Sequence, residues 1–127
     1  GHAAAWSLVP GRRLPDGSYQ RPLTAIVANL PRPGADRPAL LRHEDVVVLF
    51  HEFGHVLHST LTRAELIRFS GGNTEWDFVE APSQILEHWA WQADVLARFA
   101  RHHATRLAIG RAVRNHVTHL KPGSTSE

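Results

Sequence analysis

The segment 51–55, His-Glu-Phe-Gly-His, carries two histidines four positions apart and a glutamate directly after the first. Residues four apart lie on one face of an α-helix, so both imidazoles can reach a single ion. Glu52 stands beside that ion without being needed as a ligand, and it can hold a water molecule against the metal. This H-E-x-x-H pattern predicts a zinc site made by His51 and His55, with Glu52 next to it.

Gly54 lies inside the same predicted helix. A glycine within a helix costs about 1 kcal/mol relative to alanine, and a purely structural helix has no reason to accept that cost. Close packing of another element against the site would supply a reason. The alternative is a helix whose histidines are ordinary surface or core side chains. With ten histidines and seven glutamates, however, chance placement gives only about 0.04 such motifs in the chain.

A catalytic zinc site takes three protein ligands and keeps one position open. The third ligand must come from another element, and the next predicted helix and its approach offer several candidates: Glu75, Asp77, Glu80, Glu87 and His88. Glu80 and Glu87 are seven residues apart on one helix face, so if one binds metal the other can hydrogen-bond to an imidazole N–H. The residues alone do not choose between the candidates.

His58 shares the helix face of His51 and His55. We expect it to support the ligands or to pack against the neighbouring helix, and not to bind the ion.

Strands and turns are predicted ahead of the motif, over residues 1–30. Residues 3–9 read as one strand and 23–30 as a second, which is mostly apolar and contains β-branched residues. Between them, the Pro-Asp-Gly sequence in 14–18 predicts a tight turn with glycine in the strained position. We expect a hairpin or two neighbouring strands, followed by a proline-rich loop over 31–41.

Helices are predicted for the rest of the chain. The motif helix begins near 42–45, with Glu44 and Asp45 in its first turn, and ends near Thr62 or continues to Phe69, so the motif region covers 42–69. A second helix begins around Asp77 and runs through Ala100, with weaker helical character to 120; 121–127 form a polar tail. The fold class is therefore α+β, mainly helical: a small β-hairpin or sheet, the motif helix and a following helix that supplies the glutamate ligand.

Composition limits the remaining function classes. The 127 residues are 43% hydrophobic and 20% charged, which fits one globular domain. There is no cysteine, which excludes a disulfide framework and a Cys-based zinc site. No apolar run is long enough to span a membrane. The lack of cysteine and of a leader pattern favours the cytoplasm.

The charge of the chain is uneven, because no acidic residue occurs between Asp94 and Glu127 while six basic residues do. A basic tail can indicate a nucleic-acid partner. No aromatic–basic interleaving accompanies it, so a solvated helix face is the favoured interpretation and nucleic acid is not an expected partner.

Several spaced motifs together resemble one family. The segments 51–55, Phe-Ser-Gly-Gly at 69–72 and Asp-Phe-Val-Glu-Ala-Pro-Ser-Gln at 77–84 are similar to those of the thimet oligopeptidase family of zinc metallopeptidases, which includes neurolysin, oligopeptidase A and dipeptidyl carboxypeptidase. The similarity covers roughly residues 2–103 and includes Glu87-His88-Trp89. It implies a zincin-like core of the gluzincin type.

The resemblance also implies roles for individual residues. His51, His55 and Glu80 match the positions of the zinc ligands, and Glu52 matches the general base. The strand segment that ends at Ala28 and Asn29 resembles the one that lies beside bound substrate. The implied function is hydrolysis of oligopeptides through a zinc-bound water that Glu52 activates.

One departure from the family pattern qualifies this expectation. The family has a further helical region, with a histidine and tyrosines that stabilise the transition state, and a large N-terminal helical part. Neither matches this sequence, whose single tyrosine is Tyr19. We therefore expect a minimal or truncated catalytic core, in which zinc with a backbone N–H or His88 stabilises the oxyanion.

The same departure leaves a second hypothesis open: a truncated metal-binding fragment with little or no catalysis of its own, which acts as a binding or assembly module. Such a core would expose apolar faces and could associate into a homo-oligomer through them. The aromatic candidates for these faces are Trp6, Trp76, Trp89 and Trp91.

Overall fold

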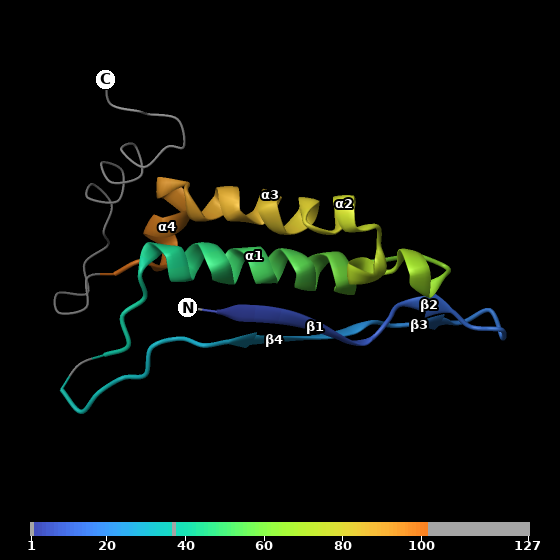
Figure 1. Cartoon of the computed structure of the whole chain (residues 1–127), viewed down its shortest axis with the longest axis horizontal. Coiled ribbons are helices and arrows are strands. Elements are labelled where there is room, and N and C mark those ends of the chain that lie inside the picture. The colour runs from blue at the N-terminus through green and yellow to red at the C-terminus, as the bar shows by residue number, and fades with distance from the viewer. Residues whose placement is uncertain (1, 37, 102–127) are drawn as a thin grey trace, which may run out of the picture.

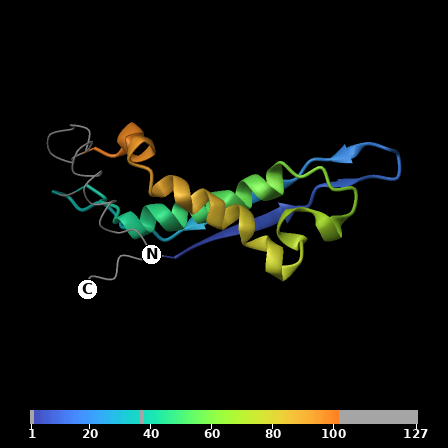
Figure 2. The ribbon, with the colours of Figure 1, turned by 90° about the horizontal axis from the view of Figure 1, so that it is seen from above.

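A long central helix, α1 (His43–Thr60), lies between a layer of strands and a layer of shorter helices (Figure 1). This is a computed structural model, and it describes residues 2–36 and 38–101. Seen from above, the second layer of helices crosses over α1 at an angle, and the strands pass beneath α1 (Figure 2). The described part of the chain is α+β and mainly helical, as predicted.

The strands form two antiparallel pairs, which follow one another along a single long hairpin. β1 (Ala3–Val9) pairs with β4 (Leu23–Ala28), and β2 (Arg12–Arg13) pairs with β3 (Tyr19–Gln20). The first predicted strand has the observed bounds, whereas the second ends at Ala28, two residues earlier than predicted. The β1–β4 pair packs against α1, so this pair fixes one side of the motif helix.

The predicted turn forms the tip of the hairpin. The Gly17 N–H donates to the Leu14 carbonyl over 2.9 Å, and Gly17 has a φ of +83°. That left-handed conformation is one that glycine adopts without steric cost. The Asp16 carboxylate accepts hydrogen bonds from the backbone and hydroxyl of Ser18, which closes the turn.

Helix α1 begins where the sequence predicts. The Asp45 carboxylate accepts a hydrogen bond from the backbone N–H of Arg42 over 2.9 Å, which caps the helix start. This backbone bond and the Arg42 side chain lower the pKa of Asp45 to about 2. The side chain of Asp45 therefore stays ionised and keeps the first turn of α1 in place.

Of the two predicted ends of this helix, the one at Phe69 is wrong, and the one near Thr62 lies close to the observed end. α1 ends at Thr60, and the Thr62 hydroxyl accepts a hydrogen bond from the Ala64 N–H, which gives the backbone a turn in place of another helical bond. Two short 3-10 turns follow, η1 (Ile67–Phe69) and η2 (Gly71–Asn73). They return the chain to α1, where Gly71 packs against Ser59.

The segment predicted as the second helix forms three separate helices in the structure. α2 (Trp76–Val79) and α3 (Ala81–Ala90) meet at Glu80, and α4 (Ala93–Phe99) follows a break at 91–92. Pro82 has no backbone N–H and fits only the first turn of a helix, so it starts α3 and does not continue α2. The predicted helical segment 103–120 and the tail 121–127 lie outside the described residues.

The break after α3 is stabilised by α1. The ring of His43 lies 2.8 Å from the carbonyl oxygen of Ala90, at the end of α3, and packs edge-on against Trp91. This contact satisfies a terminal carbonyl that a continuing helix would otherwise bind. A side chain 47 residues earlier in the chain thus stabilises the helix end, which local sequence does not reveal.

Few apolar residues are buried in the described part of the chain: Val79, Ala90 and Leu96. Trp6, Trp76 and Trp89 are exposed, whereas Trp91 is half-buried against His43. An open, apolar groove of about 380 Å³ also runs between α1 and α3, beside Leu57 and Ile85. The described residues therefore leave much apolar surface in contact with solvent.

None of the described helices combines the length and the hydrophobicity that crossing a bilayer would require.

Candidate metal centre

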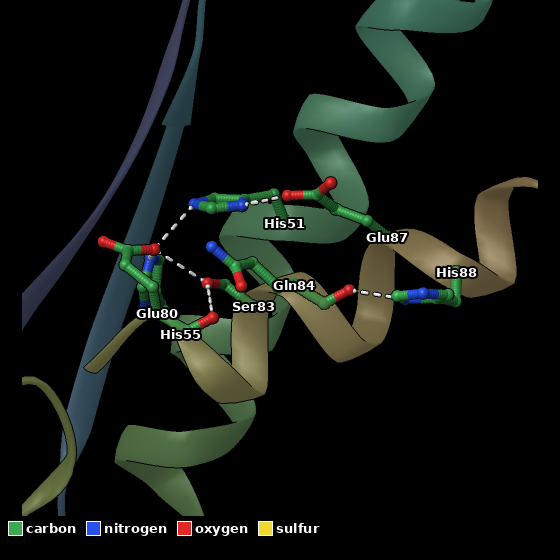
Figure 3. A network of polar contacts seen from close by, with 7 residues as sticks. All are labelled: His51, His55, Glu80, Ser83, Gln84, Glu87 and His88. Carbon is green, nitrogen blue, oxygen red and sulfur yellow. Dashed lines mark hydrogen bonds and ion pairs between the residues drawn. The ribbon is translucent and has the colours of Figure 1, made fainter. Parts of the chain in front are cut away.

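Three side chains from two layers of helices converge on one point. His51 and His55 project from adjacent turns of α1, and their ring centroids are 4.9 Å apart. Glu80 comes from the junction of α2 and α3, and its Oε2 lies 3.2 Å from His51 Nε2 and 3.3 Å from His55 Nε2. Figure 3 shows this oxygen turned toward the imidazoles and the other oxygen of Glu80 turned away.

These separations fit the ligand shell of a zinc ion. A tetrahedral site with bonds of roughly 2.0–2.1 Å places its ligand atoms about 3.3 Å apart. The two measured separations are 3.2 and 3.3 Å, and one ligand atom from each of the three residues lies within 4.8 Å of the others. The three side chains are also half-buried, so they are held in place while one side stays accessible.

Glu87 determines the proton position on His51. Its Oε1 lies 2.6 Å from His51 Nδ1, and an ionised carboxylate only accepts hydrogen bonds, so Nδ1 is the donor. In the neutral ring, Nε2 then carries a lone pair, and this lone pair faces the Oε2 of Glu80. Two acceptors in that position repel each other unless a positive charge lies between them. The donor set therefore fits a cation at this point.

Gly54 provides the close packing that its presence in the helix predicts. A Cβ atom built on Gly54 would lie 2.5 Å from Ser83 Cα and 2.7 Å from the Pro82 carbonyl oxygen. The first turn of α3 therefore touches the backbone of α1 directly, one residue before His55. The predicted close approach is confirmed, and it brings Glu80 within reach of the histidines.

We expect Gly54→Ala to destabilise the fold. The methyl group meets backbone atoms, which have no rotamer to move away, so α3 must shift; overpacking of this kind costs about 1–3 kcal/mol. Gly72→Ala is the matched control, because a Cβ on Gly72 meets no atom within 4 Å. Chemical denaturation measures both variants. Equal free energies of unfolding for the two variants would contradict the close contact.

The other candidates for the third ligand lie elsewhere. Glu75 forms an ion pair with Arg68, and Asp77 is exposed and absent from the cluster. Glu87 contacts the far nitrogen of His51 and not the side that faces Glu80. Among the described residues, Glu80 is the carboxylate that meets both histidines. Residue spacing alone left this choice open, and the family resemblance pointed to Glu80.

His88 lies away from the cluster. It is exposed, and its Nδ1 is 2.9 Å from the Gln84 carbonyl oxygen on the outer side of α3, as Figure 3 shows. The expectation that His88 stabilises an oxyanion is therefore wrong for this structure. The helical spacing explains the error, because Glu87 already faces α1 and the next residue is rotated by about 100°.

His58 packs against the other helix layer. Its ring lies 6.0 Å from the Phe78 ring in an edge-on arrangement. Burial lowers the pKa of His58 and the nearby His55 lowers it further, so the neutral ring is favoured. This residue contributes packing one turn beyond the cluster.

Glu52 and the end of β4 do not belong to the cluster of His51, His55 and Glu80. Glu52 is half-buried on α1, rotated by about 100° from His51 on the same turn. Ala28 pairs with Ala3 at the end of β4, and the Asn29 N–H donates to the His2 carbonyl over 2.8 Å. The two strands pass beside the cluster in Figure 3.

Sequence reasoning missed Ser83. This residue is fully buried, and its hydroxyl lies 2.9 Å from Glu80 Oε2. The three-residue spacing from Glu80 at the start of a helix was an available signal, because such spacing brings a side chain back to the helix start.

Comparison with known proteins places the chain among the peptidases. It belongs to Peptidase family M3, whose model matches residues 1–126. It is 48% identical over 95 residues to the thimet-like oligopeptidase of Dictyostelium discoideum, which covers 75% of this chain and 14% of that protein. It is 38% identical over 122 residues to saccharolysin of Saccharomyces cerevisiae, which covers 95% of this chain and 17% of that protein.

A bacterial relative gives the same result. Dipeptidyl carboxypeptidase of Escherichia coli is 50% identical over 88 residues, which cover 69% of this chain and 13% of that protein. The resemblance to the thimet oligopeptidase family is thereby confirmed. The chain spans between about an eighth and a sixth of the length of these relatives.

Proposed function

We propose that this chain is the zinc-binding core of a metallopeptidase that hydrolyses oligopeptides. The observation that carries the proposal is the position of one oxygen: Glu80 Oε2 lies 3.2 and 3.3 Å from the Nε2 atoms of His51 and His55. Family membership supports the substrate class, since its relatives are named as oligopeptidases. The α1–α3 arrangement would then be a zincin-like core of the gluzincin type.

His51, His55 and Glu80 would hold the ion, one per chain. A bound Zn²⁺ supplies Lewis acidity, which lowers the pKa of water and polarises a carbonyl group. Glu52 takes the proton of the attacking water and passes it to the leaving amine. Glu87 accepts the Nδ1 proton of His51, so it keeps that ring oriented and its Nε2 free to bind.

The substrate would lie along β4. Within residues 2–36 and 38–101 the β1–β4 sheet has two strands, so in this part of the chain β4 has an edge with backbone groups that an extended peptide can join. Ala28 ends β4 and Asn29 follows it, and these are the residues that we assign to the substrate side. A strand-like pose would bring the scissile carbonyl to the ion and to Glu52.

Zinc-dependent turnover tests this function directly. We expect the purified chain to cleave a quenched-fluorescence oligopeptide when zinc is present and to lose this activity with a chelator. Re-addition of zinc should restore the rate, because the ligands belong to a folded protein. Hydrolysis that persists unchanged after complete removal of metal would contradict the proposal.

A metal-binding fragment without catalysis is the second candidate. The single tyrosine, Tyr19, donates its hydroxyl to the Thr62 carbonyl, and His88 faces away, so neither side chain is placed to stabilise an oxyanion. Zinc bound at the same three residues without turnover would favour this candidate, in which the chain acts as a binding or assembly module.

Other assignments stay predictions. Association of copies through the exposed apolar faces is expected to give a mass above that of one chain in light scattering. A cytoplasmic location is likewise a prediction from composition, which fractionation of the source cells would test.

A further inference from the structure

Ser83 lies where the first turn of α3 packs closely against α1, the helix that carries both histidines. It is fully buried at the start of α3, where its Cα faces Gly54 of α1. Its hydroxyl lies 2.8 Å from the Glu80 carbonyl oxygen and 2.9 Å from Glu80 Oε2. A buried hydroxyl has one proton to donate, so the acceptor that it prefers decides what this residue does.

The carbonyl of Glu80 already has a donor. The backbone N–H of Gln84 donates to it over 2.9 Å, as the first helical bond of α3. That carbonyl therefore does not depend on the hydroxyl of Ser83, and a carboxylate oxygen is the stronger acceptor, so we assign the hydroxyl proton to Oε2. Figure 3 shows the hydroxyl oxygen within reach of both the Glu80 carbonyl and the carboxylate oxygen that faces His51 and His55.

We infer that Ser83 is a positioning residue that selects which oxygen of Glu80 faces the two imidazoles. This inference rests on the proposed function. A glutamate side chain has three rotatable bonds, and its two oxygens are chemically equal in water. The hydrogen bond from Ser83 removes that equality, because the bonded oxygen is held at the cluster while the other turns away. The contact between Ser83 and Gly54 fixes the hydroxyl itself relative to α1.

The substitution Ser83→Ala removes only the hydroxyl group. Loss of a hydrogen bond to a metal ligand typically weakens metal binding by about 10–100-fold. We expect the dissociation constant for Zn²⁺, measured by competition with a chromogenic chelator, to rise by that factor. We also expect the visible absorption bands of bound Co²⁺ to change, because the carboxylate is free to bind with either oxygen or both.

The matched control is Ser70→Ala. Ser70 is also buried, and its hydroxyl accepts a hydrogen bond from the Gly11 N–H over 3.0 Å, away from Glu80. This variant should lose thermal stability but keep the parent's zinc affinity and cobalt spectrum. A purely structural role of Ser83 would give the same result as the control.

The outcomes separate this inference from the proposed function. If the parent binds zinc through Glu80 and Ser83→Ala binds it equally well with an unchanged cobalt spectrum, the role of Ser83 is wrong and the proposed function stands. If the parent binds no zinc, both are wrong.

Circular dichroism of the metal-free proteins shows whether Ser83→Ala is folded; weaker binding by a folded variant supports the inference. For an unfolded Ser83→Ala, Ser83→Gly serves as the second variant, and unchanged zinc affinity there overturns the inference.

Discussion

Replacing Glu52 with glutamine should reduce peptide hydrolysis by about 10²–10⁴-fold while zinc binding is retained. The amide has nearly the shape of the carboxylate but cannot accept a proton at neutral pH. Glu52 does not belong to the cluster of His51, His55 and Glu80, so its change leaves that donor set intact. Initial rates with a quenched peptide, together with the metal content of each protein, measure the two effects separately.

Glu44→Gln is the control for this variant. Glu44 is exposed in the first turn of the same helix and pairs only weakly with Arg42 at 3.5 Å. The same chemical change there should leave the rate nearly unchanged. A Glu52→Gln variant as active as the parent would rule out Glu52 as the general base and leave the metal site unaffected.

Replacing Glu80 with alanine should abolish tight zinc binding. The change removes one of three donors and also the carboxylate charge, so the loss should exceed the 10–100-fold typical of residues that only support a ligand. Two imidazoles remain, and the lone pair of His51 Nε2 no longer faces an acceptor. Elemental analysis after dialysis and a competition titration measure this loss.

Glu75→Ala is the appropriate comparison for Glu80→Ala. Glu75 lies five residues earlier, is exposed and pairs with Arg68 outside the cluster. It should bind zinc as the parent does. If Glu80→Ala retained the full zinc content, the carboxylate from the second layer would not be a ligand, and the centre would have to be built from other groups.

Local patterns predicted the elements that carry the site, because local physics determines them. The spacing of His51 and His55 needs only a helix, and the capping by Asp45 and the turn at Gly17 depend on neighbours a few residues away. The free-energy cost of placing Gly54 inside a helix also indicated that another element packs closely there. Each of these features follows from steric or hydrogen-bonding rules within one turn of the chain.

The features that residue spacing alone did not reveal depend on contacts between distant segments; for the third ligand, only the family resemblance pointed to Glu80. The choice of Glu80 over Glu75 depends on where α3 packs against α1, and that contact joins residues nearly thirty positions apart. The break after Ala90 depends on a contact with His43, 47 residues earlier in the chain. The outward direction of His88 became clear only once Glu87 was found against His51.

The place of Glu80 between two helices has a consequence for how this segment tolerates insertions and deletions. The residue ends α2 and starts α3, so its direction is set by the helix that Pro82 begins. One residue added between Glu80 and Glu87 would rotate the two carboxylates by about 100° relative to each other. The two side chains could then no longer both contact His51. The turns between Leu61 and Leu66 do not separate these two carboxylates, so we expect one residue inserted there to leave the direction of Glu80 relative to Glu87 unchanged.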